Sequence, residues 1–374
     1  MEFNGRVFYL FVWGYARTIG AGTIAPNLHS KEQEPAVRLL FIIVACLISL
    51  NAAAIRVTDL YKVSIAVEDQ SQESREQGIQ LAFQQLLIKI SGYQSVLEND
   101  VLVTATASAQ QYVQGYSYQQ DEVDNQAYLQ VWFSKALVLP LMRKAQAPIW
   151  GENRPSIIHW LGLEQESERL LIAEQLPQWQ TRFERNFNER GLPVLWPLND
   201  LDDQAALPIE QLWWLFPDAI RAASQRYQAD VIMAGRISML AEQQAWQYQG
   251  VLYSGDVSHD LVFSADTPEG ALNLASGKVA ELLADQFAIK SVAVNERAGL
   301  RIRVNGVASF PAYAAMLSYL EAIPGVKSID VAQVQDKSVD LYLHLRGDWA
   351  KVQRNIELDK RLSPLQEKEF NWVR

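Results

Sequence analysis

The chain has 374 residues, of which 49% are apolar and 20% are charged, and its formal net charge at pH 7 is −10. This length exceeds one typical domain, and the apolar fraction can fill more than one hydrophobic core. The negative charge argues against nucleic acid as a partner and against binding to an anionic lipid surface.

Residues 37–54 are typical of a secretory signal peptide. Arg38 supplies the positive flank, and residues 39–50 form an apolar run that is too short for a comfortable membrane span. Ala52-Ala53-Ala54 then provides small residues for cleavage. We therefore expect a periplasmic protein that begins at Ile55 and has no integral membrane span in its mature form.

A signal peptide belongs at the start of a chain, but 36 residues precede Val37. We interpret residues 1–36 as an over-extended gene start, because a GTG codon encodes valine and also serves as a bacterial initiator. The alternative is a genuine extension, with the protein anchored in the inner membrane by an uncleaved segment 38–54.

Cys46 is the only cysteine, and it lies inside the signal segment. The mature chain would therefore have no disulfide, no thiolate chemistry and no cysteine-bound metal. Lipidation of Cys46 is a further alternative because Ala45 precedes it. The apolar run, however, continues past the cysteine, and Ile43 stands where leucine is usual.

Residues 55–147 are expected to form an α+β domain. Alternating apolar residues over 60–67 predict a strand. An apolar stripe from Ile79 to Ile90 predicts a helix that begins near Ser71 and ends at Gly92. The further predicted elements are a weaker helix over 99–114, a strand over 127–133 and a helix over 135–145.

Residues 148–289 are expected to form a central α/β domain in the order βαβαβββα around a mixed sheet. The clearest pattern lies between Ala219 and Leu240, where Ile220, Ala223 and Tyr227 share one helix face and a corner leads into the apolar run from Val231. The other predicted elements are strands over 156–161, 192–195, 246–253 and 256–263, a long polar helix over 167–190, and a helix capped by Thr267. Seven of the 11 tryptophans lie here, either as large core side chains or as a ligand-binding surface.

Residues 296–358 are expected to form a small βαββα module, and residues 359–374 a polar, frayed tail. The predicted fold class is therefore a multi-domain combination of α/β and α+β, with small βα modules flanking a central βαβαβββα sandwich.

An acidic loop is a weak metal candidate. Asp200, Asp202 and Asp203 place hard oxygen donors close together in sequence. The loop lacks the central glycine and the distal glutamate of a calcium loop, so a solvated strand end or a helix N-cap is favoured. We expect no metal and no cofactor.

Four arginines and one aspartate form a second candidate motif. Arg154, Arg221, Arg226 and Arg236 are expected to gather at one rim, where they bind an anion or pair with the acidic loop. Asp230 lies at the corner between the helix and the strand. A structural salt-bridge role is favoured over anion binding.

Four stretches carry a family resemblance and occur in order at plausible spacing: LYKVSIAVEDQS, PIWGENRP, RGLPVLWPLNDLDD and AASQRYQADVIMAGRI. In these stretches the chain resembles Gram-negative bacterial envelope proteins grouped as domain of unknown function 2066 (DUF2066). The resemblance covers most of residues 58–290 and implies an envelope protein with no assigned activity, cofactor or catalytic residue. The corner at 219–237 is also similar to corners in periplasmic assembly modules, including that of the Tol-Pal translocation protein.

The sequence contains no catalytic signature. The mature chain has histidines at 159, 259 and 344, each in a separate predicted strand, and no nucleophile-elbow, zinc-protease, Walker or dinucleotide-binding pattern occurs. The leading hypothesis is a non-catalytic interaction or assembly module that binds another envelope protein or a cell-wall component. The alternatives are an envelope hydrolase acting on glycan or peptide, and a small-ligand binder that uses the tryptophan-rich domain. A pocket with facing carboxylates would favour the hydrolase, and an exposed strand edge would favour the interaction module.

Overall fold

The computed structural model describes residues 57–373, except for residue 58 and the segments 121–125, 166–167, 174–176, 241 and 291–298. The predicted signal segment with Cys46 and the expected mature start at Ile55 lie outside the described residues. Within the described ranges, no helix is long and apolar enough to cross a membrane.

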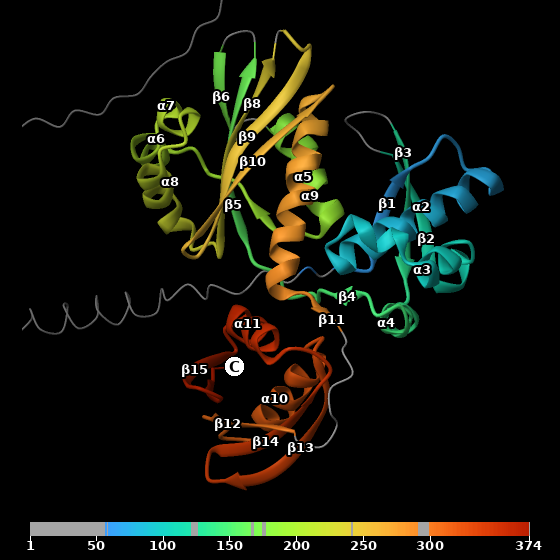
Figure 1. The fold of residues 1–374 in the computed structure, drawn as a ribbon, viewed down its shortest axis with the longest axis vertical. Coiled ribbons are helices and arrows are strands. Elements are labelled where there is room, and N and C mark those ends of the chain that lie inside the picture. Colours follow the sequence, from blue (N-terminus) through green and yellow to red (C-terminus); the bar gives the residue numbers. More distant parts are fainter. Residues whose placement is uncertain are drawn as a thin grey trace, which may run out of the picture. The chain divides into compact units, whose positions relative to one another are not determined.

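Ten α-helices and four β-sheets make up the described part of the chain, so the prediction of a multi-domain protein combining α/β and α+β structure is confirmed (Figure 1). The buried apolar side chains form four clusters. One lies within residues 60–149, two lie within residues 150–288, and one lies within residues 289–372.

The first cluster lies between helix α2 (Gln72–Ser91) and one face of a three-stranded antiparallel sheet. The Ser71 side chain caps the start of α2 by accepting a hydrogen bond from the Ser74 N–H, and Gly92 ends the helix with a φ of 83°. The sheet has the order β1-β3-β2, so β1 and β2 are its edges. The other elements of this region are β1 (Lys62–Ala66), α3 (Asp100–Thr106), β2 (Val113–Gln120), β3 (Ala127–Phe133) and α4 (Lys135–Lys144).

The predicted helix over 99–114 is wrong in its second half. The α-helix ends at Thr106, and residues from Val113 onward form β2. Tyr116 and Tyr118 pair with residues of β3. This segment is polar and has little helical pattern of its own, so cross-strand pairing makes it a strand.

The central region is a mixed sheet with helices on both faces. Its order is β10-β9-β8-β5-β6, and β7 also pairs with β5. The pairs β5–β8 and β5–β7 are parallel, and the other pairs are antiparallel. The strands are β5 (Ile157–Gln165), β6 (Glu168–Ile172), β7 (Val194–Leu195), β8 (Val231–Leu240), β9 (Ala245–Ser254) and β10 (Val257–Ala265).

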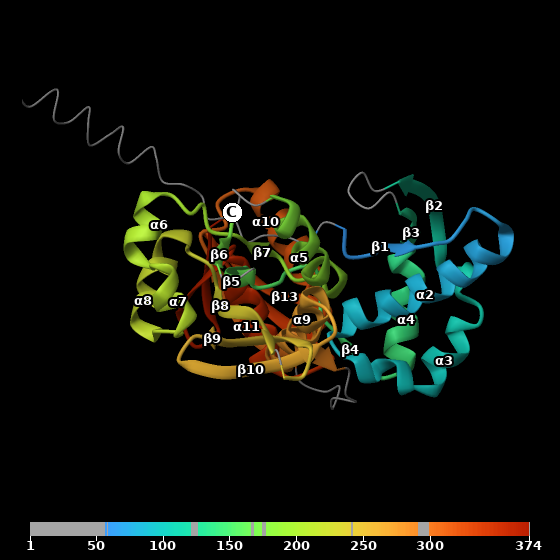
Figure 2. The same ribbon diagram turned by 90° about the horizontal axis from the view of Figure 1, so that it is seen from above.

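Helices α5 (Pro177–Arg190) and α9 (Pro268–Phe287) cover one face of this sheet. The opposite face packs against a group of short helices (Figures 1 and 2). This group consists of α6 (Leu201–Ala206), α7 (Ile209–Trp213) and α8 (Pro217–Ser224). Most of the tryptophans fill the cores, since Trp150 and Trp160 are fully buried and Trp196 and Trp213 nearly so.

Two predicted helices of this region have different bounds. The long helix over 167–190 is wrong in its first part, because Glu168–Ile172 forms β6 in a hairpin with β5, and α5 begins at Pro177. Helix α8 ends at Ser224, before a single 3-10 turn over Gln225–Tyr227.

The C-terminal region is a five-stranded sheet in the order β13-β14-β12-β16-β15, covered by two helices. The predicted frayed tail is wrong: β16 pairs in parallel with β12, and Leu362 and Phe370 are fully buried. Apolar residues at these two positions anchor a segment that is polar over most of its length. The elements are β12 (Leu300–Asn305), α10 (Phe310–Ala322), β13 (Val326–Gln335), β14 (Ser338–Leu345), α11 (Trp349–Asp359), β15 (Leu362–Gln366) and β16 (Glu369–Trp372); a short β4–β11 pair (Pro148–Ile149 and Ile289–Lys290) precedes them.

His159 lies in the core between β5 and α5. Its ring packs 5.2 Å from the Phe187 ring and 5.1 Å from the Trp196 ring, measured between centroids. Burial lowers the pKa of His159 to about 3. The folded protein therefore holds this imidazole neutral over a pH range in which an unfolded chain would protonate it.

Ala223→Asp should unfold the central region, whereas Gln225→Asp should be mild. Ala223 is buried among the α8 contacts to the sheet, and Gln225 is exposed. An unpaired buried carboxylate costs several kcal/mol, against a typical stability of about 5–15 kcal/mol. Limited proteolysis of the two variants measures the difference. Equal resistance would show that the helix presents a different face to the sheet.

His159→Phe should reduce the acid sensitivity of the fold. Because the folded pKa is about 3 and the unfolded pKa is about 6.5, protons favour the unfolded chain as the pH falls through this window. The wild-type free energy of unfolding should decline there by up to about 1.4 kcal/mol per pH unit more than that of the variant. Urea titrations between these pH values measure both slopes. His259→Phe, on β10, is the matched control and should retain the steep decline, because it leaves the buried His159 in place.

Candidate functional site

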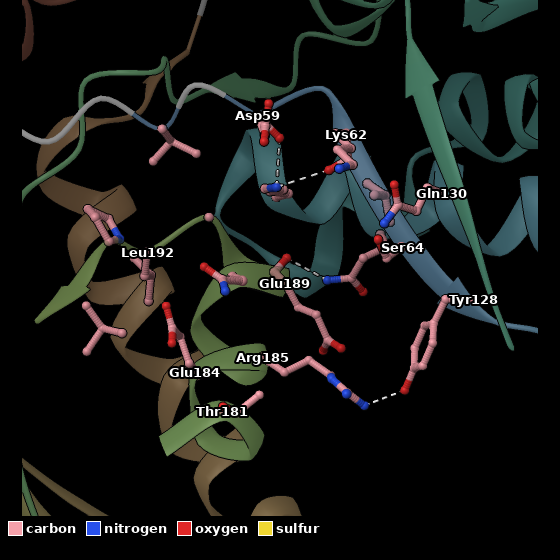
Figure 3. Close-up of a pocket in the computed structure, with 18 of the residues that line it drawn as sticks. Asp59, Lys62, Ser64, Tyr128, Gln130, Thr181, Glu184, Arg185, Glu189 and Leu192 are labelled. Carbon is pink, nitrogen blue, oxygen red and sulfur yellow. Dashed lines mark hydrogen bonds between the residues drawn. The ribbon is translucent and has the colours of Figure 1, made fainter. Parts of the chain in front are cut away.

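A groove of about 890 Å3 lies between the three-stranded sheet and helix α5 (Figure 3). The sheet forms one wall, and α5 with the chain leading into β7 forms the other. The lining residues from the sheet are Lys62, Val63, Ser64, Gln119, Gln120, Tyr128 and Gln130. Those from α5 are Thr181, Glu184, Arg185, Asn188 and Glu189.

The alternation of side chains along the strands and the helical repeat of α5 direct these side chains toward the groove. Along β1, Val63 faces α2, so Lys62 and Ser64 lie on the opposite face of the sheet, where Ser64 is paired with Gln130 of β3. Along α5, residues 181, 184, 185 and 188 follow the spacing of one helix face, whereas Phe183 and Phe187 are fully buried in the core.

The groove is polar but carries no surplus of charge. Its acidic residues are Asp59, Glu184 and Glu189, and its basic residues are Lys62, Lys89 and Arg185. Eight uncharged side chains that form hydrogen bonds complete most of the lining, namely Ser64, Gln85, Gln119, Gln120, Tyr128, Gln130, Thr181 and Asn188. Such a lining suits a ligand that is itself uncharged and rich in hydrogen-bonding groups.

Two carboxylates in the groove have perturbed acidity. Burial raises the pKa of Glu184 and of Glu189, and Arg190 and Arg185 oppose this shift at Glu189. The two groups do not converge, however. In Figure 3 the Glu189 side chain extends toward Arg185 and Tyr128, whereas that of Glu184 lies on the side of Leu192. A pair of carboxylates acting on one bond would have to flank it from a common site.

Direct hydrogen bonds join the two walls. The Arg185 guanidinium donates to the Tyr128 hydroxyl (Figure 3). Gln85 of α2 donates from Nε2 to the carbonyl oxygen of Glu189 over 2.7 Å. The sheet and its helix are thereby held at a defined spacing from α5.

Arg154, a buried residue, also fixes the spacing between α5 and the first sheet with its helix α2. Its side chain is fully buried, and it donates to the carbonyl oxygens of Gly151 over 3.1 Å, Arg190 over 2.9 Å and Lys89 over 2.5 Å. The guanidinium also stacks 4.1 Å from the Trp150 ring centroid. Lys89 lies in the last turn of α2 and Arg190 is the last residue of α5, so the Arg154 side chain links both walls of the groove.

Lys89 extends this buried cluster toward β1. Its ammonium donates to the carbonyl oxygens of Asp59 and Lys62, over 3.1 Å in each case. Burial, reinforced by the nearby Arg154, lowers the Lys89 pKa to about 8. The start of β1 is therefore tied to the end of α2.

The predicted acidic loop is a capped and ion-paired helix start. Asp200 caps α6 by accepting a hydrogen bond from the Asp203 N–H, and Arg226 contacts Asp200 over 2.7 Å and Asp203 over 3.0 Å. The Tyr227 hydroxyl also donates to Asp203, while Asp202 is exposed. No group of three or more histidine, cysteine, aspartate or glutamate side chains among the described residues could hold a metal ion.

The predicted gathering of arginines is wrong for Arg154, which lies between the ends of α2 and α5. Arg226 pairs with the acidic loop, but Arg221 stacks 4.3 Å from the Tyr253 ring centroid. Arg236 donates to the Trp213 carbonyl and to Gln249. The sequence predicts one rim for the four arginines, but each lies in a different segment and has a different partner.

Asp230 secures the corner between α8 and β8. Its Oδ2 accepts hydrogen bonds from the Ser156 N–H over 2.8 Å and from the Ser156 hydroxyl over 2.7 Å. The carboxylate thus aligns the starts of the parallel strands β5 and β8.

Comparison with known proteins identifies one similar family. A family described as Domain of unknown function (DUF8605) matches residues 54–151, which include β1, α2, β2 and β3. No curated protein and no solved structure is significantly similar to the chain. The match covers the sheet wall of the groove together with Lys89 and Gly151, but neither Arg154 nor α5.

Arg154→Met should lower the free energy of unfolding by at least about 3 kcal/mol, because it leaves several buried carbonyl oxygens without a donor. Arg221→Met is the matched control, since Arg221 is only partly buried and contacts the Tyr253 ring. It should cost about 1 kcal/mol or less. Urea unfolding of both variants measures the difference. Similar losses would show that the buried guanidinium has no special role.

Proposed function

We propose that the protein is an exported, non-catalytic binding module of the cell envelope, and that the groove between the first sheet and α5 holds its partner. The partner is a segment of another envelope protein or a cell-wall component. The observation that carries this proposal is the lining: uncharged hydrogen-bonding side chains from separate elements, with acidic and basic residues in balance.

Export is proposed from the signal-like segment 37–54 and from the resemblance to DUF2066 proteins. A cysteine-free mature chain with a net negative charge is compatible with the periplasm. The match to DUF8605 brings no activity with it.

An envelope hydrolase is the second candidate function. Glu184 and Glu189 favour it, because both line the groove and burial raises the pKa of both. Their divergent orientation favours binding over catalysis (Figure 3). A small-ligand site in the tryptophan-rich region has less support, since Trp150, Trp160 and Trp196 fill cores.

Photo-crosslinking in intact cells tests the binding function. A photoreactive amino acid in place of Gln130 or Thr181, one on each wall, should give the same covalent adduct. The control position is Val262, which is 56% exposed on β10 outside the groove. It should give no such adduct. Adducts at all three positions, or at Val262 alone, would contradict the proposal.

The double variant Glu184→Gln, Glu189→Gln separates binding from hydrolysis. A binding module should accumulate no uncleaved substrate in this variant, whatever the yield of the crosslinked adduct. Accumulation of an uncleaved cell-wall or peptide substrate in the variant, together with turnover by the wild type, would establish the hydrolase instead.

A further inference from the structure

We infer that the groove binds an extended polypeptide, which adds as a strand to the outer edge of β1. This inference rests on the proposed function and names the class of partner. It depends on where β1 lies, on which of its main-chain groups point outward, and on the chemistry of the groove around them.

β1 is an edge strand that borders the groove. In the described sheet it pairs with β3 alone, and Lys62, Val63 and Ser64 are among the groove's lining residues. Figure 2 shows β1 on the side of the sheet that faces α5. One side of the β1 edge therefore faces the groove. An exposed strand edge beside a groove is where proteins commonly bind an added strand.

The hydrogen-bond register decides which groups are available. The Phe133 N–H donates to the Tyr61 carbonyl and the Val67 N–H donates to the Ala127 carbonyl, so residues 61, 63, 65 and 67 bond to β3. Alternation then turns the N–H and C=O groups of Lys62, Ser64 and Ala66 to the outer edge. Lys62 agrees with this assignment, because its carbonyl accepts from Lys89 and its N–H donates to Asp59.

Ser64 and Ala66 offer the main-chain groups for an added strand. Both residues are exposed, and the pairing of β1 with β3 runs through five residues without a bulge. The opposite edge strand, β2, contains a register shift between Val113 and Gly115. Bulges, prolines and inward charges are the usual protection of an edge against pairing. β1 has no bulge or proline, and its one charged residue, Lys62, lies at its start.

The side chains around this edge suit a polypeptide main chain. Gln119, Gln130 and Asn188 carry amides that can both donate to and accept from peptide groups. Leu192 lies on the opposite side of the groove from Gln130 (Figure 3), and it lines the groove together with Pro193 and Val194. These apolar residues suit a single apolar side chain of the partner. The balanced charge predicts an uncharged segment that carries one apolar residue.

Proline substitutions on β1 test the register. Ser64→Pro and Ala66→Pro each remove one outward N–H, which an edge strand tolerates. Ile65→Pro removes an N–H that bonds to β3 and should unfold the first domain. Tyr116→Pro is the matched control. The main-chain N–H of Tyr116 points to the outer edge of β2, and Tyr116 does not line the groove. Circular dichroism melting identifies the folded variants.

The binding probe is a set of decapeptides enriched from a random displayed library on the purified protein. Ser64→Pro and Ala66→Pro should each weaken binding of the enriched peptides by at least about tenfold, and Tyr116→Pro should leave it unchanged. N-methylation of the peptide should weaken binding at every second residue, because only alternate N–H groups of an added strand face β1.

The outcomes separate this inference from the proposed function. If peptides bind but neither the proline variants nor the N-methylation series shows the alternation, strand addition is overturned and the groove remains a binding site. If cell-wall oligosaccharides bind and no peptide is enriched, the polypeptide assignment is overturned. Absence of groove-specific crosslinks in cells would remove the proposed function itself.

Discussion

The structure depends on one buried cation, Arg154, which pairs with no carboxylate in the described part of the chain. Arg154 instead donates to carbonyl oxygens at the C-terminal ends of two helices, α2 and α5. These carbonyls lack intrahelical donors and carry the negative end of the helix dipoles, so they offset part of the cost of burying the charge. Gly191 follows α5 with a φ of 66°, and a Cβ there would lie 2.9 Å from the guanidinium. Glycine therefore permits both the helix end and the approach of the arginine.

The same interaction gives the groove its shape. Arg154 sets the distance between the end of α2, which covers one face of the first sheet, and the end of α5, which belongs to the central core. Helix α5 contacts two parts of the molecule. Phe183 and Phe187 pack into the core of the central region, and the polar face of α5 lies toward the first sheet. This arrangement leaves a polar groove between two separately packed hydrophobic cores. The strand order places the outer edge of β1 along that groove.

Polar residues that invite a functional interpretation have structural partners elsewhere in the molecule. Asp203 is almost fully buried, and it receives hydrogen bonds from Arg226, Tyr227 and the Asn199 N–H. Asp200 is a helix cap whose carboxylate pKa is held to about 2 chiefly by its hydrogen bond from Arg226. These carboxylates hold together the short helices on one face of the central sheet. Acidic spacing in a sequence does not distinguish such a cluster from a cation site, because the arginine that completes it lies more than 20 residues away.

The sequence by itself determined the elements whose signals are local. The cap at Ser71, the stop at Gly92 and the Thr267–Pro268 start of α9 depend on nearby backbone groups, and all three lie where the sequence places them. The strands β2, β6, β15 and β16 were missed because polar residues interrupt their apolar pattern, and pairing with another strand decides their conformation. The groove is also a product of tertiary structure: its lining comes from residues 57 to 194, and none of these segments carries a catalytic or ligand-binding motif. Only the packing of α5 against the first domain, fixed by Arg154, brings their side chains to one surface.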